Sequence, residues 1–98
     1  MNVKLIRMWS GEDVVADLID EGQETITIQN PIVAVPTGQG QMGFAPWSPL
    51  LDGKDKPLAI TRKYVVYITD PNGDIIDNYN NMFSPLVTPS TSNKKLIM

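Results

Sequence analysis

The chain contains neither cysteine nor histidine. The first absence excludes disulfide bonds and thiolate metal sites, and the second removes the usual general base and the commonest metal ligand. Long apolar runs are missing too, since none approaches the roughly 18–20 residues that span a bilayer. The first residues alternate charged and apolar side chains, which is not the pattern of a secretory leader. We therefore expect a cytoplasmic protein with no membrane segment, no metal site and no cofactor.

Positive charge is also scarce. The chain has 8 Lys and Arg residues against 11 Asp and Glu, which gives a net charge of −3 and a pI near 4.6. This balance argues against a protein that wraps broadly around nucleic acid, although it is compatible with a local basic spot. With 98 residues, 42% of them hydrophobic and 19% charged, the composition is that of one folded domain rather than a disordered chain.

The most regular stretch is Gly11–Pro31, which reads as two strands joined by an acidic turn. Apolar residues occupy alternate positions in each strand: Val14, Ala16 and Leu18 in the first, Ile26 and Ile28 in the second. A period of two is typical of half-buried antiparallel strands. The intervening Asp20-Glu21-Gly22-Gln23 supplies the glycine and polar residues of a chain reversal. The pattern predicts a central β-hairpin.

Further strands are expected on both sides of this hairpin. They are predicted over Asn2–Trp9, Ile32–Val35, Gln41–Trp47 and Leu58–Thr69, the last with a turn at Arg62-Lys63. Asn30-Pro31 is expected to end regular pairing after the hairpin, because proline cannot donate to a strand ladder and restricts the residue before it.

After Asp70 the apolar period changes from two to that of a helix. One stripe contains Ile75, Ile76, Tyr79, Met82 and Phe83. Asp70 is expected to cap the helix, and Pro71 suits its first position, where an amide has no intrahelical partner. Ser84-Pro85 ends it. We thus predict a helix over about 71–83, followed by a polar tail over 86–98 that lies against its own subunit or a neighbour.

These elements predict a mainly β fold within residues 1–85. Five or so short, bent antiparallel strands in a chain of this length favour a small barrel over an open sheet, because closure removes exposed edges. The single C-terminal helix, with its apolar stripe, is expected to cover an open end or face of that barrel.

Two stretches resemble the motifs of the Sm-like (LSm) family. Gly11-x-x-Val14-x-Ala16-x-Leu18 is similar to the first motif, with Ala16 in place of its second glycine. The run from Ile60 to Ile68 is similar to the second motif, although Lys63 takes the place of the glycine that follows the arginine. The helix after the last strand and the long middle segment resemble the divergent Sm-like proteins of marine phages.

The resemblance implies a strongly bent five-stranded barrel and a homo-oligomeric ring, in which the fourth strand of one subunit pairs with the fifth strand of the next. The residues expected at that interface are Met42, Phe44, Trp47, Tyr64, Val66 and Tyr67. The resemblance also implies that single-stranded RNA binds around the central pore.

Only part of the RNA site of the family has a counterpart here. Asp20 matches the acidic residue of the first RNA-binding loop and Arg62 matches the arginine of the second, with Lys63 beside it. The first loop offers neither an aromatic ring nor an asparagine, and its glutamates would repel phosphate. Solvated turn charges are the simpler interpretation of Arg62 and Lys63. Trp47 and Tyr64 can likewise be core or interface anchors rather than base-stacking rings.

Three classes of function can be considered for this sequence. The first is an RNA-binding ring with a role in phage transcript regulation, located in the cytoplasm of an infected bacterial host. The second is a structural or assembly module that binds protein and no RNA. The third is an enzyme, which we do not expect, because no spacing pairs a nucleophile with a base.

Overall fold

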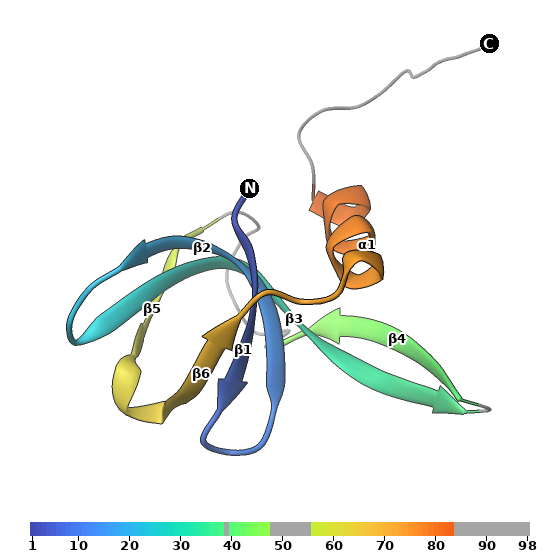
Figure 1. Ribbon diagram of the computed structural model, residues 1–98, viewed down its shortest axis with the longest axis horizontal. Coiled ribbons are helices and arrows are strands. Elements are labelled where there is room, and N and C mark those ends of the chain that lie inside the picture. Colours follow the sequence, from blue (N-terminus) through green and yellow to red (C-terminus); the bar gives the residue numbers. More distant parts are fainter. Residues whose placement is uncertain (39, 48–55, 84–98) are drawn as a thin grey trace, which may run out of the picture.

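The computed structural model describes residues 1–38, 40–47 and 56–83 (Figure 1). The elements are β1 (Val3–Met8), β2 (Asp13–Glu21), β3 (Thr25–Gly38), β4 (Gln41–Pro46), β5 (Leu58–Thr61), the 3₁₀ turn η1 (Arg62–Tyr64), β6 (Val65–Thr69) and α1 (Gly73–Phe83). The predicted central hairpin, the turn at Arg62-Lys63 and the presence of a C-terminal helix are confirmed. The predicted helix end at Ser84-Pro85 lies outside the described residues. The expected tail over 86–98 lies outside the described residues.

All the strands belong to one antiparallel sheet with the order β4-β3-β2-β1-β6, and β5 also pairs with β3. The sheet has six strands, one more than predicted, because the segment beside β3 is split in two. β4 pairs with the C-terminal half of β3, and β5 pairs with its N-terminal half at Thr25–Ile28. Figure 1 shows the hairpin of β3 and β4 extending away from β5 and β6.

The predicted end of pairing at Asn30-Pro31 is wrong, since β3 continues through both residues. Val15 of β2 faces Ile32 and Asp17 faces Gln29, so Asn30 and Pro31 together oppose Ala16 alone. This is a β-bulge, where an extra residue leaves the ladder and a proline therefore costs no ladder hydrogen bond. Asn30 has φ of 50°, a conformation that asparagine tolerates better than most residues. The bulge bends the strand instead of ending it.

The first core lies on the sheet face that curls inward. Its buried members are Ile6, Met8, Val14, Ala16, Leu18, Ile26 and Ile28, and half-buried side chains of β5 and β6 pack against them: Leu58, Ile60, Val65 and Ile68. Strands from both ends of the sheet thus share one core. No register joins β5 to β6 among the described residues, so the predicted closed barrel is seen only as a strongly bent, unclosed sheet.

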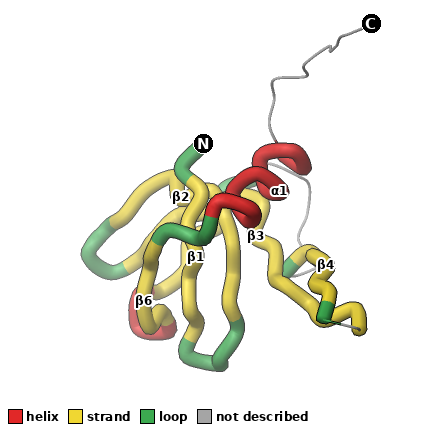
Figure 2. The backbone as a smooth tube through the Cα atoms, turned by 45° about the vertical axis from the view of Figure 1, so that its right-hand side comes forward, coloured by secondary structure: helices red, strands yellow, loops and turns green. Residues whose placement is uncertain are grey.

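The opposite face of the sheet is covered by α1, as Figure 2 shows across β1, β2 and β3. The second core contains Val3, Val15, Ile32 and Tyr79, with Ile75, Ile76 and Phe83 of the helix half-buried against it. The predicted apolar stripe therefore faces the sheet, except that Met82 is 48% exposed. β2 is buried on both faces, because one face meets the inner core and the other meets the helix.

The start of α1 differs from the prediction by two residues. The helix begins at Gly73, and the Asn72 side-chain carbonyl accepts a hydrogen bond from the Ile75 amide at 3.0 Å. Asn72 is thus the N-cap residue, whereas Asp70 forms an ion pair with Lys4 of β1. Pro71 is buried ahead of the helix rather than at its first position. The cap lies after the proline because Asp70 is held by the sheet.

The Tyr79 hydroxyl joins the helix to the bulge. It accepts a hydrogen bond from the Asp17 amide at 3.0 Å and shares its proton between the carbonyl oxygens of Gln29 and Asn30, at 2.9 and 3.0 Å. The Tyr79 side chain is fully buried, and its ring lies 4.8 Å from that of Phe83. One hydroxyl therefore replaces ladder hydrogen bonds that the bulge interrupts between β2 and β3.

We predict that Tyr79→Phe lowers the free energy of unfolding by about 1–3 kcal/mol, because the buried Asp17 amide loses its acceptor while the ring packing is kept. Urea denaturation followed by circular dichroism measures the loss. Met82→Ala, an exposed change on the same helix, should shift stability by no more than about 0.5 kcal/mol. Equal stability of Tyr79→Phe and the unaltered protein would contradict this role of the hydroxyl.

Candidate functional site

The two turns that the resemblance assigns to RNA contact lie against each other. The Arg62 amide donates to the Glu24 carbonyl at 3.0 Å, and Arg62 Nη1 lies 3.3 Å from the Gly22 carbonyl. This contact follows from the pairing of β3 with β5, in which Thr25 faces Thr61. The β2–β3 turn and η1 therefore meet at one end of the sheet.

Local hydrogen bonds fix both turns. The Gly22 amide donates to the Thr25 carbonyl at 2.8 Å and closes the β2–β3 turn. In η1 the Thr61 hydroxyl accepts from the Lys63 amide at 3.4 Å, and the Val65 amide donates to the Arg62 carbonyl. η1 reverses the chain, so that β5 runs along β3 and β6 returns along β1. The positions of Arg62 and Lys63 are thus set by the sheet.

The charge at this end is mixed. Arg62 Nη1 lies 3.5 Å from Glu21 Oε2, and both side chains are exposed. Asp20 and Glu24 are exposed as well. Lys63 is also exposed and makes no ion pair with any residue that the structure describes. The structure therefore brings the predicted Asp20, Arg62 and Lys63 to one end of the sheet. The Arg62 guanidinium, however, already forms an ion pair with the Glu21 carboxylate.

Two other basic residues, both on β1, form ion pairs with acidic residues of neighbouring segments. Arg7 pairs with Asp13 across β1 and β2, and its guanidinium lies 6.0 Å from the centre of the Tyr67 ring. The hydrogen bond and the charge of Asp13 raise the pKa of Arg7 above its usual value. Lys4 pairs with Asp70. These cations serve contacts within the chain, so Lys63 is the more accessible one for an anionic ligand.

The predicted interface residues divide into two groups. Tyr64, Val66 and Tyr67 are 59%, 53% and 43% exposed at η1 and β6. Phe44 and Trp47 are half-buried against the two cores of their own chain. The Met42 side chain lies outside the described residues. The exposed members of the predicted interface thus all come from η1 and β6.

β6 pairs with β1 along one edge, and no strand pairs with its other edge in the described part of the chain. Its sequence Val-Val-Tyr-Ile-Thr contains no charge and no proline. Edge strands of natural proteins are normally protected by such residues, because unpaired amides and carbonyls invite another strand. Val66, which the β1–β6 register skips, is an exposed apolar side chain on this edge. The edge has the properties of a strand that takes a partner.

A groove that sequence reasoning missed lies at the mouth of the bent sheet. It has a volume of about 480 Å³ and is lined by Met8, Trp9, Ser10, Trp47, Ile60, Thr61 and Tyr64, here called the aromatic groove. These residues come from three separate segments, which only the curling of the sheet brings together. The one available signal is that the chain has two tryptophans and both line this groove.

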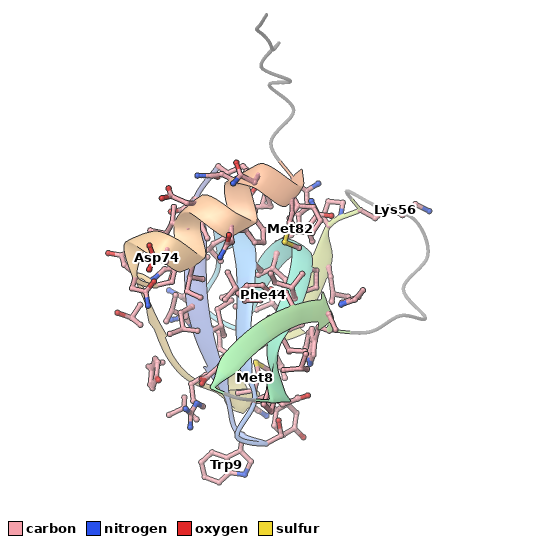
Figure 3. All side chains as sticks on the ribbon, turned by 90° about the vertical axis from the view of Figure 1, so that its right-hand side faces the viewer. Met8, Trp9, Phe44, Lys56, Asp74 and Met82 are labelled. Carbon is pink, nitrogen blue, oxygen red and sulfur yellow. The ribbon has the colours of Figure 1, made fainter. Side chains whose placement is uncertain are left out.

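Polar contacts hold one wall of the aromatic groove. Trp47 Nε1 donates to Glu12 Oε1 at 3.2 Å, and the Ser10 hydroxyl donates to the same oxygen at 3.0 Å. The Trp9 amide donates to the Tyr64 carbonyl at 2.6 Å and ties the β1–β2 turn to η1. Trp9 itself is 76% exposed, and Figure 3 shows it projecting from the end of the molecule.

Comparison with models of known protein families finds no match, and a search of curated proteins finds none either. Among the described residues no group of three or more acidic side chains could hold a metal ion. In the same part of the chain, no helix has the length and apolar character needed to cross a bilayer.

The Sm-like resemblance implies binding of single-stranded U-rich RNA. On that expectation we predict that Glu21→Gln strengthens binding of a U-rich oligonucleotide about two- to fivefold at low salt, because Arg62 loses its competing carboxylate. Stability should change by less than about 1 kcal/mol, as expected for an exposed ion pair. Fluorescence anisotropy of a labelled oligonucleotide measures the affinity. Asp77→Asn on α1 makes the same change in net charge, and an equal gain in that variant would contradict a specific effect at Arg62.

Proposed function

We propose that this chain is an Sm-like subunit that assembles into a homo-oligomeric ring and binds single-stranded RNA. The strand arrangement supports the Sm-like assignment. β4 and β5 lie along the same edge of β3, so they are two parts of an interrupted fourth strand, and β6 after the 3₁₀ turn is the fifth. The proposed barrel has its seam between β5 and β6.

The observation that carries the ring is the edge of β6, which no described strand covers and which bears exposed apolar side chains. In the proposed assembly this edge pairs with the fourth strand of the neighbouring subunit, which satisfies its backbone groups and covers Val66 and Tyr67. Each subunit has one edge of each kind, so the contact is head-to-tail, and in the proposed assembly its repetition around an axis closes into a ring rather than an open filament. Phe44 and Trp47 contribute to the interface by supporting the fourth strand from inside.

The mass of the protein in solution tests the ring. We expect native mass spectrometry to give a closed oligomer, and Val66→Lys to shift it to monomer because a charge on an edge strand opposes pairing. Ile19→Lys is the matched control, since Ile19 is 49% exposed and also lies at a bulge, but on the central strand β2. A monomer in the unaltered protein would overturn the proposed ring.

The proposed RNA binding rests on the contact between the β2–β3 turn and η1. It places Arg62 and Lys63 side by side on an exposed turn, where each subunit of a ring would contribute the same two cations. The Arg62–Glu21 pair is solvent-exposed and worth no more than about 1 kcal/mol, so a phosphate can replace the glutamate. Transcript regulation in a phage-infected cell is the role that this binding would serve.

We predict that Arg62→Ala with Lys63→Ala abolishes salt-dependent binding of U-rich RNA, because both phosphate contacts are lost. Anisotropy titrations at several salt concentrations measure the affinity and its salt slope. Lys4→Ala with Lys56→Ala removes the same charge elsewhere and should leave most of the affinity. Failure of U-rich, A-rich and mixed RNAs to bind the unaltered protein at low salt would overturn the RNA function.

One observation favours the second candidate, a protein-binding structural or assembly module. Three exposed acidic residues, Asp20, Glu21 and Glu24, lie at the turn that meets η1, and Glu21 pairs with Arg62. If the protein is oligomeric but binds no RNA at low salt, the ring with a protein partner becomes the better account. The two candidates share the edge of β6 and differ only in the ligand.

A further inference from the structure

We propose that the aromatic groove receives an unpaired base of the bound nucleic acid strand. The inference rests on the proposed function, since it names where the RNA of that function places a base. It adds a site outside the β2–β3 turn, built from residues of the β1–β2 turn, the end of β4 and η1.

The groove has the chemistry of a stacking site. Trp9, Trp47 and Tyr64 line it together with the apolar side chains of Met8 and Ile60. Met8 is buried and Ile60 half-buried in the inner core, so both form a firm apolar base, while Trp9 and Tyr64 are exposed at the rim. Flat aromatic faces beside an open apolar hollow bind nucleobases without displacing any core residue.

Charge is placed so that a base and its phosphate can bind together. Lys63 directly precedes Tyr64 and has no ion pair among the described residues, so a phosphate can lie there. Glu12 contacts two lining residues, since its carboxylate accepts hydrogen bonds from Trp47 and Ser10. A carboxylate repels phosphate but accepts from the amino or imino group of a base. The groove therefore favours a base inside it, with the sugar-phosphate backbone on the Lys63 side.

The sequence provides a direct probe, because the two tryptophans of the chain both line this groove. Stacking of a base on either ring should quench the intrinsic tryptophan fluorescence. We expect quenching by U-rich or A-rich oligonucleotides, and also by uridine or adenosine at millimolar concentration, which carry no phosphate. Unchanged emission with both nucleosides and oligonucleotides would overturn the proposed base site.

Substitutions at Trp9 separate stacking from simple apolar contact. Trp9→Leu should weaken oligonucleotide binding about tenfold, whereas Trp9→Phe, which keeps a ring, should stay within about twofold of the unaltered protein. Equal affinities of Trp9→Leu and Trp9→Phe would overturn the proposal. Trp9 is largely exposed, so the fold should tolerate both changes, as circular dichroism can verify.

The failure of the groove and the failure of RNA binding are distinguishable. If RNA binding depends on salt and on Arg62 and Lys63 but leaves the tryptophan fluorescence unchanged, the proposed base site is overturned and the proposed function is kept. Quenching by nucleosides without any binding of RNA keeps a base site and removes the RNA function. Acrylamide quenching of the tryptophan fluorescence tests whether a second copy covers the groove. Quenching that occurs only in a monomeric variant such as Val66→Lys would show that it does, and the base site would be overturned.

Discussion

The Tyr79 hydroxyl occupies the place where β2 and β3 stop matching residue for residue. It bonds the Asp17 amide on one strand and the carbonyls of Gln29 and Asn30 on the other, while the rest of its helix packs on the outer face of the sheet. The bulge at this point bends β3, so that its two halves pair with different segments, β5 and β4. The bend and the helix are therefore one structural feature, and the curvature of the sheet depends on it.

That curvature has two consequences at the seam. Side chains of β5 and β6 share the inner core although the two strands do not pair. Within the described residues this leaves β6 with unpaired backbone amides and carbonyls on one edge, beside exposed apolar side chains. The same incomplete closure leaves the aromatic groove between the β1–β2 turn, η1 and the end of β4. A closed sheet would have neither feature. The proposed self-assembly and the proposed base binding would use two different features, the β6 edge and the groove, that the incomplete closure leaves.

Much of this architecture could be predicted because it depends on local patterns. The alternation from Val14 to Ile28 fixes the hairpin, and the stripe around Tyr79 fixes the helix. The predicted end of pairing at Pro31 was wrong, because a proline that ends an ordinary strand is tolerated inside a bulge. The predicted helix cap at Asp70 was wrong, because Asp70 pairs with Lys4 from the other end of the chain. At the candidate site the resemblance assigned Asp20, Arg62 and Lys63 to RNA contact. The meeting of Arg62 with the β2–β3 turn, its contact with Glu21 and the gathering of Trp9, Trp47 and Tyr64 depend on long-range packing that no local pattern records.

Amide hydrogen exchange along β6 tests most directly whether a second copy completes this sheet. In the assembled protein the account predicts that the amides of Val65–Thr69 that point away from β1 exchange as slowly as those shared by β1 and β2. Dilution to the monomer should release them while the β1 amides stay protected. Fast exchange of the outer β6 amides at every protein concentration, with β1 and β2 protected throughout, would contradict the account.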